Sequence, residues 1–320
     1  MYASKDFLGL NVIKKYYNQL QFLSNRFPMK QSEPCETEFS WDDLYHEKEI
    51  VISDIRFELQ CVLYNIGAMH SFLGCIDKRY NDEGIKKTCS HFQCAAWAFQ
   101  TVRDIYSGLA YTNDLNEDIM SFKMNIMLAQ AQECVLEKSI IDNRKHSINS
   151  KISTQICDYY RLAITNNEKP EFSSSVGSRL TKDWKNYCLY KINYYTALTS
   201  YFASLSSSEQ EKYGESLGYI QYAETKLTEC VKMKIVFKEF QEPLKYTTDL
   251  IEMKSKLIKK DNDFVYNQKI VAVQDLPEIK GVSLVKCLQI DFLNDPEVAS
   301  QDLFSRLVSI KAHELSSLYR

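Results

Sequence analysis

Residues 57–68 read FELQCVLYNIGA, and their pattern is the clearest indication of how this chain folds. Small and large apolar side chains alternate along this stretch, and two later stretches, HFQCAAWAF at 91–99 and LAQAQEC at 128–134, repeat the pattern. Helices with such faces pack closely, because small side chains let two backbones approach. None of the three stretches has the composition of a reaction centre. We therefore expect the function to lie in a binding surface.

The composition agrees with long helices. The chain has 320 residues, 45% hydrophobic and 25% charged, with nine Gly and six Pro. Neither Gly nor Pro occurs between Gly108 and Pro170. Because both residues disfavour helix interiors, this gap predicts long, uninterrupted helices. A net charge of −3 provides no overall basic field, so we expect no nucleic-acid partner.

The ten cysteines do not indicate a disulfide scaffold. The first six residues, MYASKD, lack the basic segment and apolar run of a signal peptide. Many of the cysteines lie within apolar helical patterns, where a free thiol behaves as a small hydrophobic group. We expect a reduced, cytoplasmic chain. No apolar run approaches the roughly 20 residues that span a bilayer, so any membrane contact is expected to be peripheral.

Periodic apolar residues predict a mainly α chain. The expected helices cover residues 8–27, 56–74, 85–107, 117–141, 147–165, 187–201, 213–231, 243–260 and 299–319. Residues 37–44 and 49–55 predict two short strands that pair as a hairpin or small sheet. Residues 166–176 are interpreted as a loop, and residues 263–296 as an extended segment laid over the helices.

Three features suggest where these helices begin and end. Gly74 is the expected C-terminal cap of its helix. Asp114 with Glu117, and Ser206 with Glu209, have the spacing of capping boxes. Paired antiparallel helices of this kind resemble tetratricopeptide-like solenoids, although no clean repeat period is present.

The sequence offers little to catalysis. Cys89, His91 and Cys94 come nearest to a metal cluster, but their spacing distributes them around a helix, with His91 expected at the surface. No phosphate loop, nucleophile elbow or phosphatase loop is found, and the five histidines are dispersed. We expect no catalytic residue, no metal and no cofactor.

Four residues are candidates for binding. Val135 and Lys138 lie one turn apart near the end of one helix, and Ile148 and Ile152 lie one turn apart near the start of the next. If the helices form a hairpin near Arg144, the three apolar residues could line a shallow groove beside a positive charge. Such a groove suits an amphipathic helix. Spacing alone favours the other interpretation, in which all three apolar residues belong to the core.

Six ordered phrases resemble the BRO-one domain family, the Alix-like module of the endosomal sorting machinery. They are LYNIGA (63–68), EGIK (83–86), FQCAA (92–96), LAQAQE (128–133), KDNDFVY (260–266) and KGVSLVK (280–286). The stretches EKS (137–139), DNRK (142–145) and HFQC (91–94) are most similar to the branch that carries a phosphatase-like domain further along its chain.

The resemblance implies a boomerang-shaped helical solenoid and a non-catalytic scaffold that binds the C-terminal amphipathic helix of an ESCRT-III subunit. It assigns Val135, Ile148 and Ile152 as apolar contacts and Lys138 as their polar neighbour. It also implies recruitment from the cytoplasm to endosomes for sorting to multivesicular bodies. Tyr266 matches a tyrosine that can be phosphorylated in the family, although a tyrosine in an extended segment is commonly a packing residue.

The resemblance covers residues 1–320 as one domain, whose usual start lies earlier than Phe7. An alternative within the same fold is a cytosolic signalling adaptor that engages a small GTPase or a phosphotyrosine-dependent partner.

Overall fold

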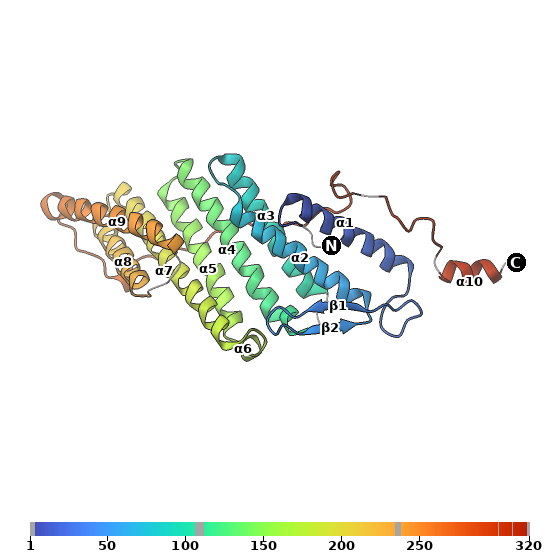
Figure 1. The fold of residues 1–320 in the computed structure, drawn as a ribbon. Coiled ribbons are helices and arrows are strands. Elements are labelled where there is room, and N and C mark those ends of the chain that lie inside the picture. Colours follow the sequence, from blue (N-terminus) through green and yellow to red (C-terminus); the bar gives the residue numbers. More distant parts are fainter. Residues whose placement is uncertain (1–3, 106–111, 234–237, 300, 309, 319–320) are drawn as a thin grey trace.

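The computed structural model describes residues 4–105, 112–233, 238–299, 301–308 and 310–318. Within these ranges the elements are α1 (Phe7–Arg26), β1 (Phe39–Asp42), β2 (Glu49–Ile52), α2 (Ile55–Ile76), α3 (Asp82–Ile105), α4 (Glu117–Ile141), α5 (His146–Asn167), α6 (Pro170–Val176), α7 (Ser178–Glu209), α8 (Tyr213–Lys232), α9 (Gln241–Asp261) and α10 (Ile310–Leu318). Figure 1 shows α1 to α9 in an elongated array, with α10 apart from it. The mainly α prediction is confirmed.

The predicted strands pair as an antiparallel hairpin. Phe39 stands opposite Ile52, and Asp42 stands opposite Glu49. Trp41 of β1 donates a hydrogen bond from Nε1 to Glu58 of α2 at 2.6 Å. This contact fixes the small sheet against the start of the first core helix.

Small residues bring α2 and α3 close together, as the opening stretch predicts. A Cβ on Gly67 would come within 3.0 Å of Ala98 Cβ. Gly74 is not the helix cap that was expected, because α2 continues to Ile76. Its missing side chain instead makes room for the ring of Phe92, whose Cε1 would lie 2.7 Å from a Cβ there.

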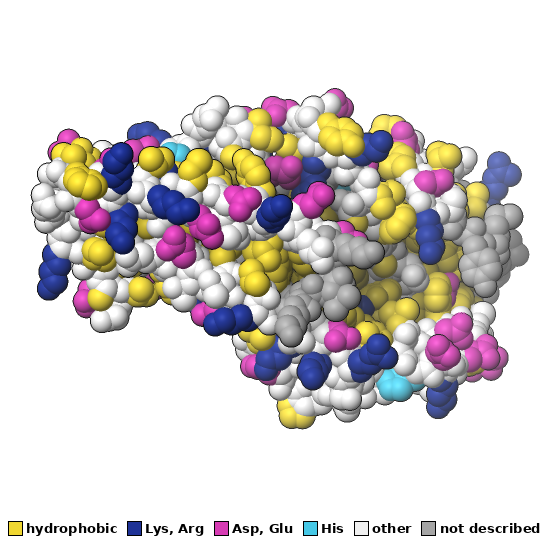
Figure 2. All heavy atoms as spheres, turned by 60° about the vertical axis from the view of Figure 1, so that its left-hand side comes forward, with side chains coloured by type: hydrophobic (Ala, Val, Ile, Leu, Met, Phe, Trp, Pro, Cys, Tyr) yellow, Lys and Arg dark blue, Asp and Glu magenta, His cyan; other side chains and the backbone are white. Residues whose placement is uncertain are grey.

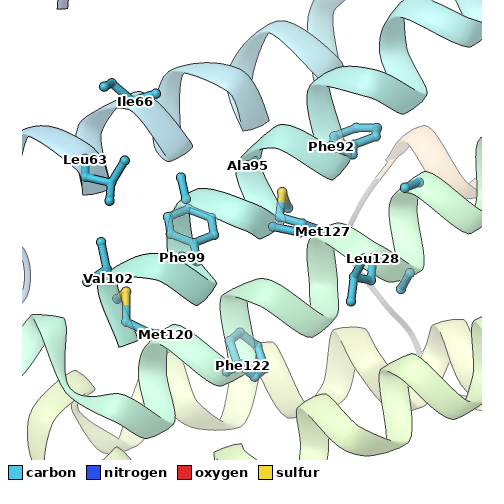
Figure 3. Packing of buried hydrophobic residues seen from close by; sticks show 14 of the residues in the cluster. Leu63, Ile66, Phe92, Ala95, Phe99, Val102, Met120, Phe122, Met127 and Leu128 are labelled. Atoms are coloured by element: carbon cyan, nitrogen blue, oxygen red, sulfur yellow. The ribbon is translucent and has the colours of Figure 1, made fainter. Parts of the chain in front are cut away.

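One large core joins α1 to α7. Figure 3 shows residues of α2, α3 and α4 meeting in it, among them Leu63, Phe99 and Met120. A smaller cluster of apolar residues packs α8 and α9 against α7. Among the described helices, α2 is the one that is long and apolar enough to cross a membrane. Its place in the core explains this composition. The expectation that no run reaches that length was wrong, but 56% of this apolar window is buried inside the protein.

Two predicted capping boxes are wrong. Helix α4 is capped by Asn116, whose side chain accepts a hydrogen bond from the Asp118 amide at 2.7 Å. Asp114 instead lies in a short 3₁₀ turn and accepts one from the Leu44 amide at 3.1 Å. Ser206 and Glu209 lie inside α7, and α8 begins without a side-chain cap. Local spacing therefore gave the wrong capping residues, although α4 and α8 begin at Glu117 and Tyr213 as expected.

The predicted loop at 166–176 is also wrong for most of its length, because residues 166–167 end α5 and residues 170–176 form α6. Pro170 occupies the first turn, where proline is tolerated. Phe172 is fully buried and packs edge-on to Phe122, with ring centroids 5.3 Å apart. Burial of this aromatic ring against α4 stabilises a helix of only 7 residues.

Residues 267–299, here called the strap, run as an extended segment across the helices. Residues 263–266, expected to belong to it, instead complete a π-helical turn after α9. Gln132 of α4 holds the strap at two points: its Nε2 donates to Val282 O at 2.9 Å, and its Oε1 accepts from the Leu284 amide at 3.1 Å. Gln93 of α3 accepts from the Lys286 amide at 3.0 Å, and Asn18 of α1 donates to Phe292 O at 3.2 Å.

The final helix is shorter than predicted, because α10 begins only at Ile310. The described residues between 301 and 308 form turns. There, Gln19 of α1 donates to Gln301 O at 3.1 Å and accepts from the Leu303 amide at 3.0 Å. Arg26 of α1 forms an ion pair with Asp302. These contacts with α1 compete with helix formation in this part of the chain.

Candidate partner-binding surface

The four candidate residues lie at the hairpin between α4 and α5, where the sequence predicted a turn. Asn143 has a left-handed backbone with φ of 51°, and the Arg144 amide donates to Ser139 O at 3.0 Å. Ser139 also donates a hydrogen bond from its hydroxyl to Asn149 Oδ1 at 2.5 Å. The ends of the two helices are thus joined by both backbone and side-chain bonds. The predicted hairpin is confirmed.

The structure places Ile148 and Ile152 in different surroundings, although they are one turn apart. Ile148 is 38% exposed, whereas Ile152 is 2% exposed and belongs to the core. The expectation that Ile152 lines an accessible groove is therefore wrong. Ile148 lies in the first turn of α5, next to the turn of the hairpin, whereas Ile152 lies one turn further into the helix. Val135 is intermediate, half-buried and packed against the core.

Lys138 is held by two carboxylates. Its Nζ lies 2.7 Å from Asp82 Oδ2 of α3 and 2.5 Å from Asp142 Oδ1. Hydrogen bonds to Asp142 and Asp82 raise the pKa of Lys138, so it stays charged. Its charge is largely balanced within the protein. The lysine therefore fixes the start of α3 to the end of α4 as much as it offers a charge to a partner.

The strap contributes to this surface, which the sequence did not reveal. The Val282 amide donates to the carbonyl of Lys151 at 3.2 Å, and Val282 O accepts from Gln132. Lys151 and Gln132 each lie within one helical turn of a candidate residue, Ile148 and Val135 respectively. Val282 and Leu284 are 43% and 55% exposed. Exposed apolar side chains of the strap thus border the hairpin.

Glycine allows the strap to lie this close to α5. A Cβ on Gly281 would come within 2.8 Å of Asp158 Oδ2 and 2.9 Å of Gln155 Oε1. Tyr159 of α5 and Ser283 of the strap are hydrogen-bonded through their hydroxyls at 2.7 Å. The surface formed by Val135, Lys138 and Ile148 with Val282 and Leu284 is called the hairpin surface below. Figure 2 shows one face of the molecule, on which Lys and Arg are interspersed with Asp and Glu and with apolar side chains.

The other residues singled out in the sequence lie elsewhere. His91 is buried, not exposed as expected, and its Nδ1 lies 2.9 Å from His70 Nδ1 across the interface of α2 and α3. In the described parts of the chain, no three His, Cys, Asp or Glu side chains are grouped to hold a metal. Tyr266 is 44% exposed and stacks on Tyr213 of α8, with ring centroids 3.5 Å apart. Its phosphorylation stays a prediction.

Comparison with known proteins identifies the family. Residues 2–320 match the model of the BRO1-like domain. The human tyrosine-protein phosphatase non-receptor type 23 is 42% identical over 316 residues, which cover 98% of this chain and 19% of that protein. The ALG-2 interacting protein X of Dictyostelium discoideum is 30% identical over 96% of this chain and 38% of its own length. The chain thus spans about a fifth of the first relative and under two fifths of the second.

A solved structure of the ALIX BRO1 domain in complex with CHMP4C has the same fold. It superposes with a TM-score of 0.83 at 25% identity, covering 95% of this chain and 84% of that one. The boomerang-shaped helical architecture implied by the sequence phrases is confirmed by this match. The chain belongs to the BRO1-like domain family.

Proposed function

We propose that this protein is a non-catalytic scaffold whose hairpin surface binds the C-terminal amphipathic helix of an ESCRT-III subunit. The observation that supports it is the exposure of Ile148 on α5 and of Val282 and Leu284 on the strap, in a fold whose ALIX relative was solved with CHMP4C. Through this contact the cytoplasmic protein is recruited to endosomes and acts in sorting to multivesicular bodies.

The shape and chemistry of the surface suit such a helix. An amphipathic helix presents apolar side chains at every third or fourth position, and these can lie along the exposed apolar side chains of the hairpin and strap. Arg144, 60% exposed in its side chain, provides a positive charge for an acidic flank of the helix. Ile152 supports the floor of the surface from inside the core instead of touching the partner.

Ile148→Asp tests the proposal. Burying one aliphatic side chain contributes about 1.5–3 kcal/mol, so the variant is expected to weaken binding of a fluorescent C-terminal CHMP4C helix by about tenfold or more. Fluorescence anisotropy measures the affinity, and thermal unfolding should be unchanged because Ile148 is partly exposed.

Leu162→Asp is the matched control, since Leu162 is an exposed apolar residue on the same helix, 51% accessible. It lies fourteen residues further along α5, roughly 21 Å away by helical rise, and should bind normally. Unchanged affinity for Ile148→Asp, or equal loss in both variants, would remove the hairpin surface as the binding site.

A further inference from the structure

A second concave region lies on another side of α4, away from the hairpin surface. It is a cavity of about 580 Å³ between α2, α3, α4 and α7. Among the described residues its walls are mainly apolar and aromatic, including Phe99, Phe122, Ile126, Leu180 and Trp184. Figure 3 shows Phe99 coming from α3 and Phe122 from α4. The volume and lining are those of small-molecule sites, which are mostly apolar with few polar groups.

The distinctive polar group in this cavity is the ammonium of Lys123. Its Nζ lies 4.4 Å from the ring centroid of Tyr64, 5.6 Å from that of Tyr45 and 6.0 Å from that of Phe99. It also donates a hydrogen bond to the Tyr64 hydroxyl. Among the described residues, no carboxylate forms an ion pair with Lys123 within 4.0 Å. The ammonium is thus surrounded by aromatic rings and a phenol, and no carboxylate of the described residues contacts it.

The surroundings of Lys123 destabilise its charged form. Burial lowers the pKa of Lys123 to about 7, and the charge of Asp114 offsets this only in part. Buried charges in proteins are normally paired. A bound anion would restore the ammonium and satisfy its remaining donors. Tyr64 offers a second donor: its oxygen accepts from Lys123, and its own proton has no acceptor among the described residues.

We propose that this cavity binds a small apolar carboxylic acid, with the carboxylate against Lys123 and Tyr64 and the apolar body along Phe99, Phe122 and Leu180. One cation and one hydroxyl match the single charge and two oxygens of a carboxylate. The described lining contains no arginine fork of the kind that holds a phosphate. This site is independent of the hairpin surface and of its partner.

Decanoate and 1-decanol, which differ only in the head group, test the assignment by isothermal titration of the 320-residue chain. Decanoate should bind the wild type with one site. Lys123→Met should weaken decanoate by about tenfold or more, because a charge-assisted hydrogen bond is lost, and change decanol less than about twofold. Leu180→Trp, which fills the cavity from a half-exposed position, should weaken both.

The pH profile provides a readout that a structural role would not change. The titratable groups facing Lys123 or the cavity are Tyr45, Tyr64, Asp114, Asp183 and Tyr187. Burial raises the pKa of Tyr45 and Tyr64, so both phenols stay protonated. Because the carboxylate prefers the ammonium form of Lys123, wild-type affinity should increase as the pH falls from about 8.5 to about 6.5. Lys123→Met should lose this dependence.

Lys86→Met is the control for net charge, since Lys86 is an exposed lysine of α3 far from the cavity. It should bind decanoate as the wild type does. Equal binding of decanoate and decanol to the wild type, or unchanged decanoate affinity in Lys123→Met, would overturn the proposal. Absence of decanoate binding to the wild type would do the same.

Discussion

Helix α4 directs two charged side chains into the protein, ten residues apart, and their surroundings are opposite. Glu133, in the C-terminal half, pairs with Lys191 of α7 at 3.0 Å and accepts a hydrogen bond from the Tyr160 hydroxyl at 2.6 Å. Lys123, in the N-terminal half, meets aromatic rings and a phenol. The part of α4 around Glu133, where the buried charge is paired, is called the sealed half below. The part around Lys123, which borders the cavity, is called the open half.

The comparison shows that the partner, and not burial alone, sets the charge state. Burial acts against both lysines. For Lys191, the carboxylate of Glu133 outweighs burial and raises the pKa above its ordinary value. For Lys123, burial outweighs the charge of Asp114, and the pKa falls to about 7. The buried pair of Glu133 and Lys191 therefore contributes to stability, whereas Lys123 borders the cavity proposed above as a binding site.

Removing the partner in the sealed half should have the largest effect. Glu133→Gln leaves Lys191 buried without a counter-charge, in the state that Lys123 occupies now. The expected loss in the free energy of unfolding is about 3–5 kcal/mol, measured by chemical denaturation at neutral pH. Glu137→Gln on the same helix removes an exposed pair with Arg79 and should change stability by less than about 1 kcal/mol. Similar losses in the two variants would contradict the comparison.

Loosening the strap over the sealed half should have a smaller effect. Gln132→Ala leaves Val282 O and the Leu284 amide without their partner, which costs about 1–3 kcal/mol. Hydrogen exchange should become faster at the Leu284 amide, and the control Gln130→Ala should leave that rate unchanged. Gln130 is on the same helix, and its Oε1 has no hydrogen-bond partner. An unaltered rate at Leu284 in Gln132→Ala would mean that other contacts hold the strap.

The smallest effect is expected in the open half. Lys123→Met removes a poorly paired cation and should stabilise the protein at pH 7 by up to about 1 kcal/mol, because apolar replacements of buried charges are often neutral or favourable. The folded-state pKa, near 7, lies below the ordinary lysine value of 10.5, so the unfolded chain binds the proton more strongly. Wild-type stability should therefore rise as the pH increases from about 7 towards 9, relative to Lys123→Met.

Chemical denaturation across this pH range measures the difference between the two proteins. Lys86→Met should follow the wild-type curve. A parallel pH dependence in wild type and Lys123→Met would show that Lys123 keeps its ordinary pKa.

Much of the helical array could be predicted because its signals are local. A run without Gly or Pro predicts the long helices α4 and α5, and the close contact of α2 with α3 follows from Gly67 and its small neighbours. The helix caps and α6 could not be predicted in the same way. Asn116 caps α4 in place of Asp114, whose spacing to Glu117 suggested a capping box. Phe172 packs on Phe122 and stabilises a helix where the sequence suggested a loop.

The candidate site was predicted in part. The sequence phrases identified the hairpin residues. Ile148 and Ile152 lie one helical turn apart, however, and this spacing does not distinguish an exposed side chain from a buried one. The border supplied by Val282 and Leu284 was missed, since those residues lie more than 130 positions away from Ile148. A signal was available in Gln93 and Gln132, two amides in the middle of otherwise apolar faces.

The amino-acid sequence alone indicates which segments form helices, which small residues let the helices approach, and which family the chain resembles. These properties depend on residues within a few positions of one another. The solvent-facing side of each helix, the course of the strap and the pairing of the buried charges became known from the three-dimensional arrangement alone. Those outcomes depend on Coulomb and packing contacts between groups far apart along the chain, such as Glu133 with Lys191.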